Sequence, residues 1–100
     1  MAFIDEYPQL TEDFLAITQR LSKMSPEVAE RIDIAVDMWH AYESPLAIET
    51  VLDLIADPEG AEIQLLFSDF SRLMYISGCI GSTRHVWVDF APPGCLVTRD

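Results

Sequence analysis

Carboxylates at helical spacing are the residues of this chain best suited to a chemical role. Two trios repeat at intervals of three or four residues, and they are Glu30, Asp33 and Asp37 followed by Glu49, Asp53 and Asp57. On a helix, each trio shares one face. Neighbouring acids about 5–6 Å apart approach the charge spacing of one nucleic-acid strand, about 3.4 Å per phosphate. Such rows attract cations and basic surfaces.

Metal binding is the first chemistry to test against these residues. Asp37 and His40 are three residues apart and offer two ligands on one helix face. Carboxylate sites in helical bundles need an acid-x-x-His unit from each of two helices, and this unit occurs only once here. Cys79, Cys95, His40 and His85 lack the paired spacings of structural zinc sites. We therefore expect no bound metal and no cofactor.

Catalytic motifs are missing from the sequence. Ser82 follows Gly81, but there is no Gly-x-Ser-x-Gly nucleophile turn. The four glycines form no phosphate-binding loop. Acids are plentiful, yet the sequence places no two of them in a cleft as a glycosidase would require. We expect a protein that is not an enzyme.

Net charge restricts the class of partner. The formal charge is −11, and fifteen of the seventeen acids but only three of the six bases lie in residues 1–69. This field repels nucleic acid and anionic membranes and attracts basic protein surfaces. No apolar run is long enough for a membrane span, and the N-terminus lacks the features of a signal peptide. The expected location is cytoplasmic, with Cys79 and Cys95 reduced.

Three capping pairs mark the elements that would position the acids. A capping side chain is followed by proline at Ser25-Pro26, Ser44-Pro45 and Asp57-Pro58, as is typical of helix starts. These pairs predict helices over about 26–43, 45–56 and 59–75. Thr11 resembles a further N-cap, after a single turn over 1–10, for a helix ending near Met24. Short connections make neighbouring helices antiparallel.

The predicted fold is therefore one mainly-α domain over 1–100, with a small antiparallel four-helix bundle at 11–75. The apolar period places Trp39 and Tyr42 on the inner face of the second helix and Phe67 and Phe70 on that of the fourth.

Residues after Met74 follow a different pattern. Gly81-Ser82 is a suitable turn between a strand ending at Ile80 and one starting at Thr83, so 76–90 is predicted as a β-hairpin or an extended arm. In an alternative α+β interpretation, β structure starts at Ile63 and turns at Ser68-Asp69. Residues 91–100 form an extended tail, whose apolar segment at 95–97 either packs on the bundle or binds a partner.

Function is predicted from this surface. We expect a non-catalytic inhibitor whose acidic helical face docks on a basic, nucleic-acid-handling partner, with both trios replacing phosphates and Trp87 adding an apolar contact. In charge, size and compactness the chain resembles the small inhibitors that phages use against restriction or CRISPR complexes, which act in the host cytoplasm. The hypothesis requires that Arg20, Lys23, Arg31 and Arg72 do not neutralise the trios. The alternative is a helical adaptor or subunit, including a homodimer, that associates through apolar surface while the acids maintain solubility.

Overall fold

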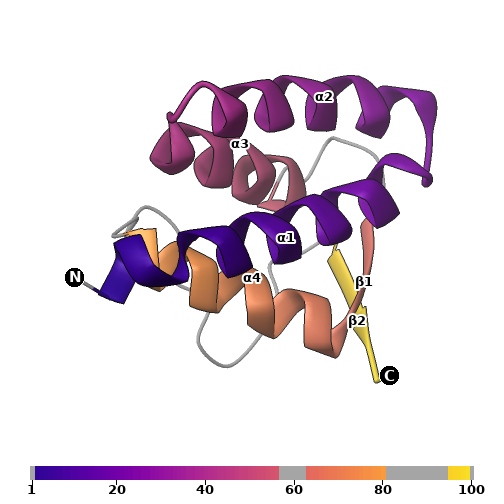
Figure 1. The fold of residues 1–100 in the computed structure, drawn as a ribbon. Helices are drawn as coiled ribbons and strands as arrows, with labels where there is room; N and C mark the ends of the chain where they lie inside the picture. The colour runs from indigo at the N-terminus through magenta and orange to yellow at the C-terminus, as the bar shows by residue number, and fades with distance from the viewer. Residues whose placement is uncertain (1, 57–62, 81–94, 100) are drawn as a thin grey trace.

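Four helices and a two-stranded parallel sheet form the part of the chain that the structure describes (Figure 1). The computed structural model describes residues 2–56, 63–80 and 95–99. In chain order its elements are α1 (Ala2–Ser22), α2 (Pro26–His40), α3 (Ser44–Ala56), β1 (Ile63–Leu66), α4 (Phe67–Ile80) and β2 (Cys95–Thr98). The prediction of a mainly-α fold is confirmed.

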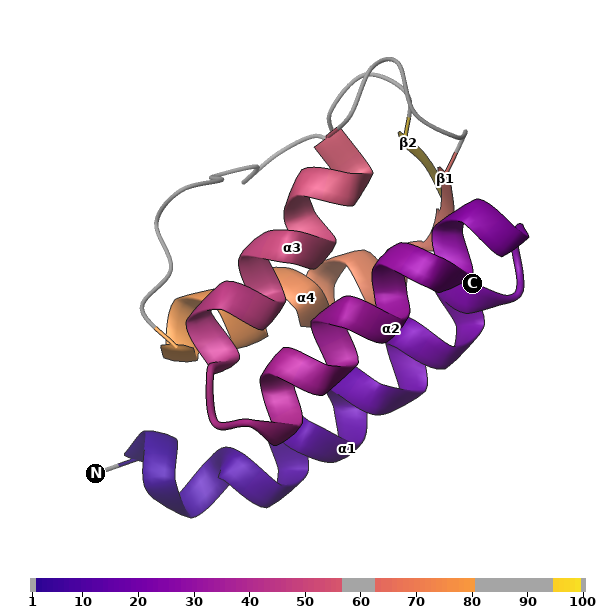
Figure 2. The same ribbon diagram turned by 90° about the horizontal axis from the view of Figure 1, so that it is seen from above.

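Each helix packs antiparallel to the helices that it contacts, around one core (Figure 1). α2 contacts both α1 and α3, and α4 contacts α1 and α3 from the other side (Figures 1 and 2). Each helix contributes an apolar stripe to the centre. The largest fully buried side chains include Trp39, Phe14, Leu10, Ile17, Leu21, Ile48, Leu52, Ile55, Ile63, Leu73 and Ile76. The Cα radius of gyration is 12.5 Å. Among the described residues, no helix has the length and apolar character needed to span a bilayer.

Helix α1 is longer than predicted. It begins at Ala2, includes Pro8 and continues through Thr11. The predicted turn over 1–10 and the predicted N-cap at Thr11 are therefore wrong. Proline lacks one backbone donor, yet the helix continues through Pro8 into a stripe of buried apolar residues. The buried members of that stripe are Leu10, Phe14, Ile17 and Leu21.

Helix α2 begins as predicted and ends earlier than predicted. The Ser25 Oγ accepts the Val28 N–H at 3.2 Å, so Ser25 is the N-cap before Pro26. At the other end the Tyr42 N–H donates to Trp39 O at 3.1 Å, and the N–H of residue 43 donates to the carbonyl of residue 38 at 2.9 Å. This pair of bonds is a Schellman motif, with Tyr42 at the left-handed position where glycine is usual.

Tyr42 itself is not a core residue. Its φ is 63° and its side chain is 85% exposed, so the predicted inner-face position is wrong. The helical period that predicted it does not extend past His40, where α2 ends. α3 starts at Ser44, one residue from the predicted boundary, whereas the third capping pair at Asp57-Pro58 lies outside the described residues.

The predicted fourth helix over 59–75 is replaced by a strand and a helix. β1 covers Ile63–Leu66 with alternating buried and exposed residues, and α4 follows directly at Phe67. Phe70 is buried as predicted, but Phe67 is 59% exposed and its predicted core position is wrong. A four-residue segment with three apolar residues fits either the helical or the strand period, and pairing with a distant strand decides for β.

The predicted hairpin over 76–90 is also wrong at its first strand, because α4 continues to Ile80. Its turn and second strand, residues 81–90 with Trp87 and His85, lie outside the described residues. The predicted tail instead contains β2, which runs parallel to β1 with Ile63 opposite Cys95 and Leu65 opposite Val97. The α+β interpretation placed β structure at Ile63 correctly, but its meander with a turn at Ser68-Asp69 is replaced by α4.

Candidate acidic docking surface

The outer face of α2 is set by the anchoring of its inner face. Val28, Ile32, Ala35 and Trp39 are all fully or almost fully buried. Residues halfway around the helix from this stripe must point into solvent. The orientation of α2 therefore decides which of its acids a partner meets.

Trp39 locks α2 onto α1. Its ring stacks on Phe14 with centroids 4.2 Å apart and planes 16° apart. Its Nε1–H donates to the Thr11 Oγ1 at 2.8 Å. Stacking and a hydrogen bond together fix both the rotation and the axial position of α2 against α1. Sequence periodicity identified Trp39 as buried but not the hydroxyl that satisfies it.

The first trio forms what we call the acidic row, consisting of Glu30, Asp33 and Asp37 of α2. All three residues are exposed. With a rise of about 1.5 Å per residue, the row extends about 10 Å along the helix. Glu27, also exposed, lies in the first turn of α2 and adds negative charge at the Glu30 end of the row.

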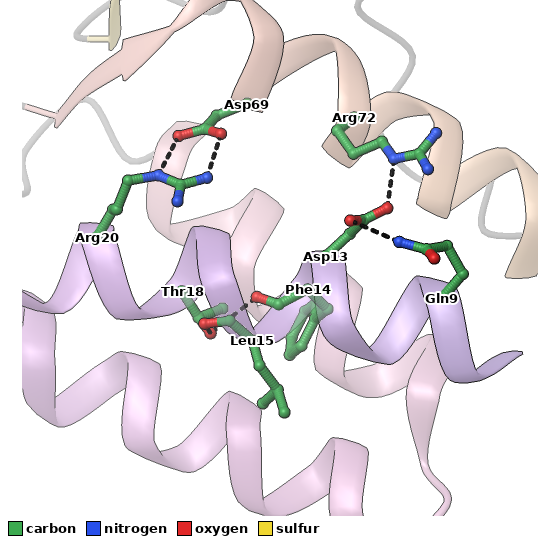
Figure 3. Close-up of polar contacts among 8 residues, drawn as sticks. All are labelled: Gln9, Asp13, Phe14, Leu15, Thr18, Arg20, Asp69 and Arg72. Carbon is green, nitrogen blue, oxygen red and sulfur yellow. Dashed lines mark hydrogen bonds and ion pairs between the residues drawn. The ribbon is translucent and has the colours of Figure 1, made fainter.

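Two arginines, Arg20 and Arg72, pair with acids outside the acidic row (Figure 3). Arg20 Nε and Nη2 donate to both carboxylate oxygens of Asp69, at 2.8 and 2.5 Å. Arg72 Nε donates to Asp13 Oδ2 at 2.5 Å, and Gln9 Nε2 donates to Asp13 Oδ1 at 3.2 Å. Both pairs join α1 to α4. Neither of these two ion pairs uses a member of the acidic row.

The second trio has a different environment. Glu49 and Asp53 are half-buried on α3, and each already interacts with another group of the protein. Asp57 lies outside the described residues, as does Trp87. The six acids and the tryptophan that the sequence combined into one surface thus separate into an exposed row on α2, two engaged residues on α3, and two positions of which the structure says nothing.

A groove runs beside the acidic row, between α1 and α2. Its volume is about 300 Å³. It is lined by Leu15, Thr18, Gln19 and Ser22 from α1 and by Ile32, Asp33 and Val36 from α2. Asp33 therefore belongs to the row and the groove at once. Sequence reasoning missed this groove, since it depends on how two helices are spaced.

Metal ligation gains no support from the arrangement. Among the described residues, no three His, Cys, Asp or Glu side chains are grouped closely enough to hold an ion. Asp37 and His40 are both exposed on α2 and offer two groups at most. The chemistry available on this face is that of exposed carboxylates.

Comparisons with other proteins add no assignment to this geometry. No protein-family model, no curated protein and no solved structure matches the chain.

Proposed function

We propose that this protein is a non-catalytic binding protein whose acidic row docks on a basic protein surface. The observation that carries the proposal is the exposure of Glu30, Asp33 and Asp37 on one rigidly anchored helix face, apart from the ion pairs of Arg20 and Arg72. Like charges at this spacing cost each other a few tenths of a kcal/mol. A basic partner would relieve that repulsion.

The sharpest form of the proposal is nucleic-acid mimicry. Three carboxylates over about 10 Å of helix compare with three phosphates over about 7 Å of one strand. A groove of Lys and Arg that binds nucleic acid would accept such a row, and the rigid bundle behind it would block the groove. In this form the protein is an inhibitor of a cytoplasmic nucleic-acid-handling protein, of the kind phages direct against restriction or CRISPR complexes.

Charge reversal within the row tests the proposal. The partner is first captured from a lysate of the native host at low ionic strength, eluted with salt and identified. Binding of the purified partner is then measured for the doubly substituted Glu30→Lys/Asp37→Lys variant. Loss of two close charge pairs and gain of two repulsions should raise the dissociation constant at least tenfold at about 50 mM salt and flatten its salt dependence.

The matched control is Glu12→Lys/Glu43→Lys, which carries the same net charge on exposed residues outside the row. This control should retain most of the affinity if position matters, and lose as much as the test variant if only net charge does. Equal losses, or capture of a partner with no basic surface, would reject the docking assignment.

Apolar exposure where β1 ends and α4 begins favours a second candidate function. Leu66 is 40% and Phe67 is 59% exposed, although the fold offers a core a few residues away. Such adjacent apolar side chains are typical of a contact surface. In this reading the chain is a small subunit or homodimer, and the acids maintain its solubility.

A further inference from the structure

The groove between α1 and α2 combines an apolar wall with a single charged group. Leu15 and Val36 are half-buried and Ile32 is buried, and these three provide most of its aliphatic lining. Asp33 is the only charged residue in the lining. A ligand that fits this pattern has an aliphatic body and one cationic end.

The hydroxyl groups of the groove are already used by α1. Thr18 Oγ1 donates to the carbonyls of Phe14 and Leu15, at 2.9 and 3.0 Å (Figure 3). Ser22 Oγ donates to Gln19 O at 2.8 Å. The Asp33 carboxylate, which only accepts hydrogen bonds, and the Gln19 amide, which both donates and accepts, remain at the edge of the groove. The one charged group among them is an anion, and it favours a cationic ligand.

We propose that this groove receives one arginine side chain of the basic partner. The inference rests on the proposed function, and it names the partner side chain that the groove beside the acidic row would bind. The three methylenes of the arginine lie on the aliphatic wall, and the guanidinium pairs with the two carboxylate oxygens of Asp33. Arginine suits the site better than lysine because its cation is more weakly hydrated and matches a carboxylate with two parallel bonds.

The neighbouring acids strengthen this assignment. Glu30 and Asp37 flank Asp33 at three and four residues along α2, so all three contribute to one negative field at the groove. That field raises the local concentration of cations without selecting among them. The aliphatic wall supplies the selection, because only a cation with a stem gains from it.

A small arginine analogue tests the groove without the partner. Butylguanidinium is titrated into ¹⁵N-labelled protein at constant ionic strength and followed by amide chemical shifts. Guanidinium, which lacks the stem, and butylammonium, which lacks the planar head, are titrated in parallel. We expect saturable shifts centred on Leu15, Ser22, Ile32 and Val36, strongest with butylguanidinium.

Variants then connect the shifts to the groove. Asp33→Asn should weaken butylguanidinium binding about threefold to fivefold, as expected for a partly exposed ion pair. Gln19→Trp, at an exposed residue of the rim, should fill the groove and abolish the saturable shifts. Glu12→Gln, which removes an acid elsewhere on α1, should leave them unchanged.

The inference is overturned if the shifts spread over every exposed acid, if guanidinium alone binds as well, or if Asp33→Asn and Glu12→Gln behave alike. These results are separable from failure of the proposed function. If Glu30→Lys/Asp37→Lys weakens partner binding but butylguanidinium does not bind in the groove, the arginine site is rejected. Docking through the acidic row is then retained.

Discussion

Asp69 and Tyr42 show how differently one residue can contribute to this fold. Asp69 is a buried carboxylate whose two oxygens both accept bonds from Arg20. It also lies in the first turn of α4, where the helix dipole favours an anion. Tyr42 is the opposite case, because it holds a left-handed backbone while its ring contacts mainly solvent.

Replacing Tyr42 with glycine should stabilise the protein. A non-glycine residue in the left-handed region costs about 1–2 kcal/mol, and the greater freedom of unfolded glycine returns about 0.5–1 kcal/mol of that. We expect Tyr42→Gly to raise the free energy of unfolding by roughly 0.5 kcal/mol, measured by urea denaturation followed by circular dichroism.

The control for this prediction is Tyr42→Ala, which removes the ring but keeps Cβ. Because the side chain is 85% exposed, this change should leave the unfolding midpoint almost unaffected. A substantial loss of stability in Tyr42→Ala would mean that the ring packs against the protein. Its contacts would then offset the energetic cost of the left-handed backbone.

Among the elements, α1 and α4 are joined by two ion pairs, and each helix supplies the acid of one pair and the base of the other. Asp13 of α1 pairs with Arg72 of α4, and Arg20 of α1 pairs with Asp69 of α4 (Figure 3). Only one antiparallel register satisfies both pairs, since a shift of one turn would bring like charges together. The guanidinium of Arg72 also lies 4.8 Å from the centroid of the Tyr75 ring. The pairs thus specify how the two helices align.

Replacing either member of the Arg20–Asp69 pair should lower the free energy of unfolding, but by unequal amounts. The Asp69 side chain is 10% exposed and that of Arg20 is 50% exposed. Arg20→Met leaves a buried carboxylate without its cation, at a cost of about 1–3 kcal/mol. Asp69→Asn leaves a half-exposed guanidinium that water can solvate, so its cost should be smaller by about 1 kcal/mol.

Urea unfolding of both variants at neutral pH measures this difference. Arg72→Met provides a comparison, because its partner Asp13 is more exposed than Asp69 and should tolerate the loss better. Equal destabilisation by Arg20→Met and Asp69→Asn would indicate that solvent reaches the pair and that burial does not decide its energetics.

For the whole molecule, the dominant property is a net charge of −11 on a particle with a radius of gyration of 12.5 Å. Two such molecules repel each other at low salt, and the repulsion is screened over about 10 Å at 0.1 M. Any association between copies must therefore work through apolar contact. The exposed pair Leu66 and Phe67 is the surface to examine.

Light scattering on a size-exclusion column, at about 0.05 and 0.5 M NaCl, distinguishes the two candidate functions. If docking on a basic partner is the function, the isolated chain should remain a monomer at both salt concentrations. If the chain is a homodimer, dimer should increase with salt and disappear in Phe67→Ser. Leu46→Ser, at a residue 50% exposed on α3, is the matched control and should leave that dimer intact.

Much of the helical framework follows from local chemistry. The Ser25-Pro26 start of α2 and the exposure of Glu30, Asp33 and Asp37 could be predicted, because capping and the 3.6-residue period act over a few neighbouring residues. The end of α2 could not, since a tyrosine at a left-handed position leaves none of the usual glycine signal. The candidate row was therefore foreseen, and the groove beside it was not.

What the amino-acid sequence determined by itself is a mainly-α chain with an acidic face on its second helix, because apolar period, caps and charge are properties of short segments. Tertiary structure decided the remainder. Ile63–Leu66 became a strand because it pairs with Cys95–Thr98, and Arg20 found its acid 49 residues away. These outcomes depend on which distant segments meet, and that is settled by packing of the whole core instead of by any local preference.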